Sequence, residues 1–464
     1  MDFRLGKDQQ HFAELGQKFL LNKFLDLCRK KNIPDIGWDE NILVEFLTWL
    51  SRQDSNNQLR YQVIGAGERE GRISCSLVGR LHFNMTHGIG RSGNILDSQP
   101  KAQGSTIINM LANALSLEAL HIYGLKAAKG TLVVPLCTGA SISLCLSGLR
   151  NDFKEKNPNI NVPRYVIWMR ADQMSAPKAI INAGFDIIVV EPIPENKNEL
   201  SFINREIFCI ISCTQCFAPR EPDDIIEISR IAKATDVYHI VNNAYGVAVT
   251  NINENFSKAA SSKDCRIDAI VQSLDKNFQT PVGGSVIATL KQKSIIKFAK
   301  SYPGRASAIP SRDFVLTMLN QGVIGLKKSL ILREELYVLL RNLLTSKIAS
   351  KYGEKVLASK NTAEEGNGIS MCMTLSSIKP ENQSLLGSML FHRGVTGSRV
   401  VPSTSILNIK KLQNYELENY FSHSKYSNHG GYINFAVSIG MKEAEVYGLI
   451  DVLDNVLSQL IKKS

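Results

Sequence analysis

Residues 269 to 277 read Ala269-Ile270-Val271-Gln272-Ser273-Leu274-Asp275-Lys276-Asn277, an apolar run that ends in polar residues. Short apolar runs of this kind recur between about residue 130 and residue 290, several of them separated by helical patterns. The other runs are Leu132 to Val134, Tyr165 to Met169, Ile187 to Val190, Phe208 to Ile211, His239 to Val241 and Val286 to Ala288. Buried strands that alternate with helices predict an α/β domain with a mostly parallel sheet covered on both faces. Ligands of such sheets bind at the carboxyl ends of the strands.

The flanking segments have different patterns. Before about residue 60, apolar residues recur on one helical face after the expected N-cap Asp39. After about residue 330, a long helical segment is followed by strand-like runs, Met371 to Leu375 and Tyr432 to Val437, and by a final amphipathic helix. The sequence therefore predicts an N-terminal helical region (1–60), an α/β domain (61–320) and a smaller α+β domain (321–464).

Composition narrows the class of protein. A chain of 464 residues with 44% hydrophobic content is long enough to bury a large core. Its 54 Lys and Arg against 43 Asp and Glu give a net charge of +11, which suits a polyanion such as RNA but also serves solubility. We find no signal peptide or membrane span, and the nine cysteines are typical of a reducing compartment. We expect a cytoplasmic protein with free thiols.

Two motifs are better explained without a ligand. The segment Gly88 to Gly93 matches GxGxxG, but no clean apolar strand precedes it and no acidic residue closes a βαβ unit at the right distance. Cys209, Cys213 and Cys216 have the spacing of an iron–sulfur site, but Cys209 lies within an apolar strand, where it packs as a small apolar residue.

The histidines also give no metal site. His82 and His87, like His423 and His429, have no carboxylate or cysteine at ligand spacing. We therefore expect no metal in this protein.

Lys276 is the first residue with a chemical role. It would leave the end of a buried strand and enter the ligand crevice. A partly desolvated lysine amine is nucleophilic and forms a Schiff base with an aldehyde such as pyridoxal phosphate. By itself, however, a lysine after a strand is usually a solvated cation.

Two further segments favour pyridoxal phosphate. Asn242-Asn243-Ala244-Tyr245-Gly246 follows a strand and resembles the Asp-x-Ala-Tyr segment of fold-type-I pyridoxal-phosphate enzymes, with Asn242 in place of the aspartate that faces the pyridine nitrogen. Thr138-Gly139-Ala140-Ser141 opens an apolar helix and would offer backbone N–H groups to the cofactor phosphate. The alternative explanation of the first segment is an asparagine-rich turn, and that of the second is tight packing between strand and helix.

With these segments in place, the whole chain resembles the O-phosphoseryl-tRNA(Sec) selenium transferase family. The matching segments run in the expected order from about residue 60 to 440. They are Gly67 to Arg72, His87 to Gly93, Gln99 to Ala102, Cys216 to Arg220, Ile240 to Gly246, Gln272 to Asn277, Tyr302 to Ser307 and Arg399 to Pro402.

The resemblance implies a fold-type-I transferase with pyridoxal phosphate on Lys276. It would convert O-phosphoseryl-tRNA(Sec) to selenocysteinyl-tRNA(Sec), with selenophosphate as the selenium donor. Phosphate would leave the β-carbon after loss of the α-proton, and selenium would then add, with the freed lysine amine as general base. The resemblance also implies a homotetramer assembled through the N-terminal helices, with tRNA(Sec) as a partner and with neither DNA nor a membrane.

By this resemblance, each site residue of the family corresponds to a residue of this chain. Those that would hold the phosphate of phosphoserine are Arg91, Ser92, Gln99 and Arg305. Those that would contact the cofactor are Arg69, Gly139, Ala140, Ser141, Asn242, Ser273 and Lys276. Those that would meet tRNA phosphates are Lys263, Arg399 and Lys463. Glu68 would repel the α-carboxylate of a free amino acid, a charge that the tRNA ester lacks.

Other functions stay open from the residues alone. A related fold-type-I enzyme, either a tRNA-dependent cysteine synthase or a lyase of free amino acids, would use the same lysine. Glu68 and the two arginines favour phosphoserine on tRNA over these. A catalytically silent RNA-binding scaffold is disfavoured by the joint presence of Lys276, Arg91 and Arg305.

Overall fold

The computed structural model describes residues 7–58, 64–68, 70–191, 206–218, 220–357, 368–403, 409–418 and 431–462. Four residues discussed above therefore lie outside the described residues: Arg69, His423, His429 and Lys463. Within the described part, no helix combines the length and the apolar character needed to cross a membrane.

A seven-stranded sheet forms the centre of the large domain, in the order β1-β7-β6-β5-β4-β2-β3. The strands are β1 Gly130–Val134, β2 Tyr165–Met169, β3 Asp186–Val190, β4 Ile207–Cys213, β5 Tyr238–Asn242, β6 Ala269–Ser273 and β7 Ser285–Thr289. Only β7 runs against its neighbours β1 and β6, and the remaining pairs are parallel. The predicted strands and the mostly parallel sheet are thus confirmed.

Helices cover both faces of this sheet. On one face lie α5 Gln103–Ile122, α9 Thr250–Ser261 and the start of α12 Ile309–Leu343, and on the other lie α6 Thr138–Lys156, α7 Ser175–Asn182 and α11 Ile295–Ser301. Within β1, Val133 packs into the first layer while Leu132 and Val134 pack into the second, because successive side chains of a strand point to opposite faces. α8 Ile225–Ala234 is capped by Asp224, whose carboxylate accepts from two backbone N–H groups.

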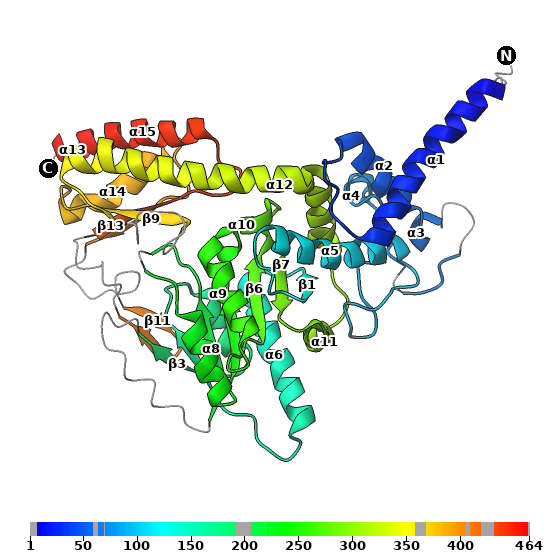
Figure 1. The fold of residues 1–464 in the computed structure, drawn as a ribbon, viewed down its shortest axis with the longest axis horizontal. Helices are drawn as coiled ribbons and strands as arrows, with labels where there is room; N and C mark the ends of the chain where they lie inside the picture. The colour runs from blue at the N-terminus through cyan, green and yellow to red at the C-terminus, as the bar shows by residue number, and fades with distance from the viewer. Residues whose placement is uncertain are drawn as a thin grey trace.

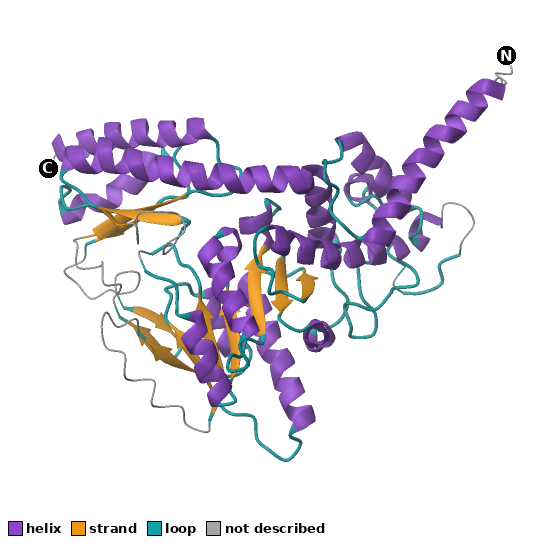
Figure 2. Ribbon diagram, in the orientation of Figure 1, coloured by secondary structure: helices purple, strands orange, loops and turns teal. Residues whose placement is uncertain are grey.

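The smaller domain is an antiparallel sheet under a layer of helices (Figures 1 and 2). Its strand order is β10-β13-β9-β8, with β8 Val356–Leu357, β9 Ser370–Thr374, β10 Arg399–Pro402 and β13 Gly431–Ala436. The helical layer consists of the second half of α12, the π-helical η4 Leu344–Ala349, α13 Ser350–Tyr352, α14 Pro380–Phe391 and α15 Glu443–Lys462. A separate hairpin, β11 Lys410–Leu412 with β12 Tyr415–Leu417, packs on the large domain.

The N-terminal region is helical, as predicted. It holds α1 Lys7–Lys30, α2 Glu40–Ser51, α3 Ser55–Gln58 and α4 Ser76–Leu81. Asp39 caps α2 by accepting the N–H of Ile42 at 3.0 Å, and Phe46 in α2 is fully buried against Phe24, with ring centroids 5.2 Å apart. The amino-terminal half of α1 extends away from the rest of the chain (Figure 1).

α12 crosses the predicted boundary between residues 320 and 321. The helix is interrupted at Gly322, whose φ of 64° and ψ of 174° are not helical. A Cβ at this position would lie 2.6 Å from the backbone nitrogen of Gly37, so only glycine fits there. The division into three parts stays a prediction.

Candidate active site

The carboxyl ends of six parallel strands meet at one edge of the large sheet. β1, β2, β3, β4, β5 and β6 all end there, because parallel strands share their direction. Lys276 follows β6 directly, within α10 Leu274–Phe278. It therefore lies at the edge where the sequence predicted the ligand crevice.

Two polar groups and one ring surround the amine of Lys276. Its Nζ donates to the hydroxyl of Ser273 at 3.2 Å and lies 3.4 Å from Oδ2 of Asp275. The ring of Tyr245 is 5.4 Å from the same nitrogen. Burial raises the pKa of the Tyr245 hydroxyl to about 12, so this phenol stays protonated at neutral pH. The segment after β5 and the lysine after β6 thus form one cluster.

A buried side chain fixes the short helix that carries Lys276. The amide of Asn277 donates to the backbone carbonyls of Ser273 at 2.8 Å and of Ala244 at 2.9 Å. Leu274, the first residue of α10, is fully buried. The helix ends at Gln279, whose φ of 54° is left-handed. These contacts tie the lysine to the loop after β5.

Asn242 and Asn243 are both buried at this edge. Oδ1 of Asn242 accepts the N–H of Ala244 at 3.3 Å, and Oδ1 of Asn243 accepts the hydroxyl of Thr214 at 2.7 Å. A Cβ at Gly246 would come within 2.1 Å of Oδ1 of Asn243, so the turn requires glycine at that position.

The start of α6 gives one hydroxyl without a partner. Oγ1 of Thr138 is buried and has no hydrogen-bond partner within the described part of the chain. Ser141 is occupied, because its hydroxyl shares a 2.5 Å hydrogen bond with Ser285. Gly139 packs on α7, where a Cβ would meet that of Ser175 at 3.0 Å. Thr138 and the first N–H groups of α6 can therefore receive an anion.

Gln173, which follows β2, was missed in the sequence. Its Nε2 is buried and finds no acceptor among the described residues. The only available signal was its place in Arg170-Ala171-Asp172-Gln173, a polar segment directly after a strand. A buried amide left unpaired is costly unless a ligand completes it.

These groups fit pyridoxal phosphate. A lysine amine, a helix N-terminus, a buried hydroxyl and a buried amide gather at the ends of β6, β1 and β2. An aldehyde needs the amine, and a phosphate needs the helix N-terminus with its hydroxyl.

The segments that carry Arg91 and Arg305, two of the predicted phosphate-binding residues, lie side by side and form a second cluster. Ile89 and Ala306 exchange two backbone hydrogen bonds, of 2.9 and 3.1 Å, which place the loop of Arg91 beside the segment of Arg305. Ser92 has a φ of 49°, in the tight turn where the N–H of Arg91 donates to Asn94 at 3.0 Å. Here the GxGxxG segment is a loop and does not follow a strand.

A cavity of about 560 Å³ adjoins this second cluster. Its lining includes Arg72, His87, Arg305 and Arg312, but neither Arg91 nor Lys276 among the described residues. Burial and the neighbouring cations Arg305 and Lys101 lower the pKa of His87. Its imidazole is therefore neutral at pH 7.

Glu70 is a further residue that sequence reasoning missed. Its carboxylate pairs with Lys101 at 2.5 Å and accepts the N–H of Gly67 at 3.0 Å. The hydrogen bond from Lys101 lowers the pKa of Glu70. Glu68, the predicted filter, is exposed on the same loop. Glu70 thus joins the loop of Glu68 to the loop of Gln99.

The predicted tRNA contacts lie apart from one another. The guanidinium of Arg399 lies 4.3 Å from the ring centre of Phe217. Its positive charge also lowers the pKa of Tyr245, which burial raises. It is therefore near the Lys276 cluster. Lys263 is exposed between α9 and β6, at the amino end of that strand. The two residues flank opposite edges of the sheet.

Comparisons with known proteins identify the family. The profile of O-phosphoseryl-tRNA(Sec) selenium transferase, SepSecS, matches residues 53–458. The chain is 44% identical to the O-phosphoseryl-tRNA(Sec) selenium transferase of Caenorhabditis elegans, over 100% of this chain and 95% of that protein. It is 39% identical to the Dictyostelium discoideum enzyme of the same name, over 95% and 94% of the two chains.

Solved structures give the same result. The crystal structure of an archaeal O-phosphoseryl-tRNA(Sec) selenium transferase superposes with a TM-score of 0.82 at 28% identity, covering 98% of this chain and 99% of that one. Tryptophan decarboxylase of Catharanthus roseus, with a TM-score of 0.56 at 12% identity over 99% and 100% of the two chains, shares the fold alone. The fold is that of the fold-type-I pyridoxal-phosphate enzymes, as predicted. The chain belongs to the O-phosphoseryl-tRNA(Sec) selenium transferase family, whose members convert O-phosphoseryl-tRNA(Sec) to selenocysteinyl-tRNA(Sec).

Proposed function

We propose that this chain carries out its family's reaction with pyridoxal phosphate held on Lys276 and with selenophosphate as the selenium donor. The observation that carries this proposal is the Lys276 cluster at the carboxyl edge of the sheet. When bound, the cofactor would withdraw electrons from the α-carbon of phosphoserine, which makes the α-proton acidic.

Lys276 has two roles in this proposal. Its amine would hold the cofactor, and the free amine would take the α-proton of the substrate as general base. The Ser273 hydroxyl, 3.2 Å away, orients that amine through a hydrogen bond. On the basis of the family resemblance, Asn242 would face the ring nitrogen of the cofactor. A neutral amide stabilises a protonated ring nitrogen less than a carboxylate would.

The cofactor phosphate would lie at the start of α6. Thr138 and the backbone N–H groups of Gly139 and Ala140 would bind it there, whereas the N–H of Ser141 already donates to the carbonyl of Cys137 at 3.0 Å, and Gln173 would pair its amide with the bound group. Arg69 is proposed as a further phosphate ligand on the basis of the family resemblance.

The loop of Arg91 and the segment of Arg305 would hold the phosphate of phosphoserine. Two guanidinium groups bind a phosphate through charge-assisted hydrogen bonds and stabilise it as it leaves the β-carbon. Ser92 and Gln99 would complete this site. Glu68, exposed on its loop, would repel the α-carboxylate of free phosphoserine.

We further propose a cytoplasmic homotetramer that binds tRNA(Sec) through Lys263, Arg399 and Lys463. Support for assembly comes from α1, which exposes Leu15 and Phe19, the latter 68% exposed. Large apolar side chains on an extended helix favour burial against another chain.

The test compares the wild type with Lys276→Ala and Arg305→Ala. Phosphate release and selenium incorporation would be measured on phosphoseryl-tRNA with selenophosphate, beside free phosphoserine. We expect turnover of the tRNA-borne substrate only, none in Lys276→Ala, and at least a tenfold loss in Arg305→Ala. Activity that survives the loss of Lys276 would refute the cofactor site, and turnover of free phosphoserine would indicate a lyase. Incorporation of sulfur in place of selenium would indicate a cysteine synthase.

A further inference from the structure

A second cavity lies at the opposite edge of the large sheet from Lys276. Its volume is about 610 Å³, and it lies where β5 and β6 begin and the antiparallel β7 ends. The lining is mainly cationic, with two carboxylates, Asp236 and Asp268. Its cationic residues are Lys156, Lys233, Lys263, Arg266, Lys291 and Lys297.

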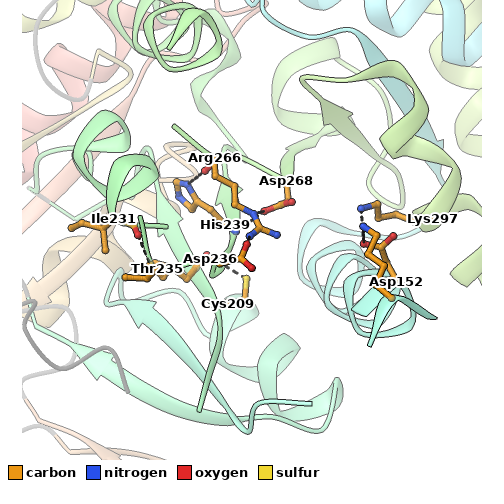
Figure 3. Close-up of polar contacts among 11 residues, drawn as sticks. Asp152, Cys209, Ile231, Thr235, Asp236, His239, Arg266, Asp268 and Lys297 are labelled. Carbon is orange, nitrogen blue, oxygen red and sulfur yellow. Dashed lines mark hydrogen bonds and ion pairs between the residues drawn. The ribbon is translucent and has the colours of Figure 1, made fainter. Parts of the chain in front are cut away.

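Three of these cations are already neutralised. Arg266 pairs with Asp236 at 2.7 Å and with Asp268 at 2.9 Å (Figure 3). Lys156 and Lys297 share the carboxylate of Asp152, at 2.8 and 3.1 Å. These pairs cancel the charge on one half of the lining.

The other three cations have no such partner. Lys233, Lys263 and Lys291 make no ion pair with any described residue. They come from the last turn of α8, the loop after α9 and the segment after β7. Like charges gathered around one hollow create a positive potential that attracts an anion.

Helix ends explain only part of this charge. Lys156 and Lys233 lie in the last turns of α6 and α8, where a cation complements the helix dipole without any ligand. Lys263 and Lys291, however, lie outside the helices. The dipole explanation therefore leaves these two lysines without a structural role.

The floor beneath the lysines is rigid. The guanidinium of Arg266 lies 4.2 Å from the ring centre of Tyr238. The backbone carbonyl of Arg266 lies 3.1 Å from Nδ1 of His239 (Figure 3). His239 is fully buried, and its Nε2 lies 2.8 Å from the hydroxyl of Ser212. These contacts thus hold the base of the cavity in place beneath the exposed lysines.

We propose that this cavity binds backbone phosphates of an RNA, with Lys233, Lys263 and Lys291 as the ligands. The inference rests on the proposed tRNA substrate and adds Lys233 and Lys291 to its contacts. A small substrate held at Lys276 could not reach the opposite edge, because the strands of the sheet separate the two sites. An RNA is long enough to contact both edges at once, and lysines bind its phosphates without reading sequence.

The test is equilibrium binding of an uncharged tRNA(Sec) transcript over a series of salt concentrations. The variant is Lys233→Glu/Lys291→Glu, and the matched control is Lys347→Glu/Lys379→Glu, two exposed lysines of the smaller domain. We expect the variant to lose at least tenfold in affinity and the slope of log K against log salt to fall by about two, because two phosphate contacts are lost. The control should change affinity less than twofold. Lys233→Gln/Lys291→Gln, with thermal unfolding alongside, shows whether the loss depends on charge in a folded protein.

Unchanged affinity and slope in the charge-reversed variant would overturn the inference. So would weaker binding of tripolyphosphate in the variant with RNA binding intact, which would make the cavity a small-anion site. Turnover of phosphoseryl-tRNA by the wild type, measured in parallel, tests the proposed function separately. Wild-type turnover with unchanged RNA affinity in the variant refutes only this inference, whereas lysine-dependent RNA binding without turnover refutes only the proposed function.

Discussion

The amine of Lys276 lies 3.2 Å from the hydroxyl oxygen of Ser273, the last residue of the strand that precedes it. The Ser273 hydroxyl in turn donates to Asp275, so the three side chains form one polar chain at the end of β6. This chain sets the direction of the amine.

Ser273→Ala should therefore lower kcat more than it raises KM. A hydrogen bond between neutral groups contributes about 0.5–1.5 kcal/mol, which corresponds to a fall of roughly twofold to tenfold. Single-turnover phosphate release from phosphoseryl-tRNA would measure this fall in rate. Ser273→Thr keeps the hydroxyl and should recover most of the rate. An equal loss in both variants would show that the site is sensitive to packing and not to the hydrogen bond.

Glu70→Gln should weaken the contact that holds the loop of Glu68 against the loop of Gln99. The amide keeps the shape of the side chain but removes the charge that pairs with Lys101. We expect KM for phosphoseryl-tRNA to rise about fivefold or more, with a smaller change in kcat. Glu227→Gln, an exposed helical position remote from these loops, is the control. Unchanged kinetics in Glu70→Gln would refute a positioning role for this pair.

His239 should make stability depend on pH. Burial lowers its pKa in the folded protein to about 4, against an ordinary value of 6.5. Since the unfolded chain binds the proton more readily, this contribution is fully present above about pH 6.5 and is lost as pH falls toward 4. Its size is about 3 kcal/mol.

The measurement is the thermal midpoint between pH 4 and pH 8. In His239→Gln, the thermal midpoint should fall less steeply below pH 6.5 than in the wild type, whatever the stability of the variant at pH 8. His392→Gln, at an exposed position, should retain the wild-type slope. Identical slopes in all three proteins would argue against the assignment to His239.

Gly322→Ala should destabilise the protein by about 1–3 kcal/mol, because its φ of 64° is strained for any other residue. The added Cβ would also meet the backbone nitrogen of Gly37 at 2.6 Å. Gly325→Ala in the same helix is the matched control. There the nearest atom is the flexible side chain of Gln321, and alanine favours the helix. Thermal unfolding of both variants would show the difference in stability. Equal thermal midpoints would contradict the requirement for glycine at the break in α12.

The large sheet and its site edge were readable from the sequence. Strands buried on both faces appear as short apolar runs, and each of the seven expected runs became a strand. Lys276 and Asn242 could be placed because each lies within a few residues of the end of such a run. A residue at the end of a parallel strand lies at the ligand edge whatever the rest of the fold does.

Contacts between distant segments were not readable. The pairing of Glu70 with Lys101, the unpaired amide of Gln173 and the break at Gly322 each depend on what another part of the chain places beside them. Local pattern gives the direction of a side chain but not its partner. The sequence by itself thus determined the strands, the edge and the position of Lys276 at that edge, because burial and strand direction are periodic and local. Only the tertiary structure brought lysines as far apart as Lys156 and Lys291 around one cavity, because the distance between them depends on how the strands are ordered in the sheet.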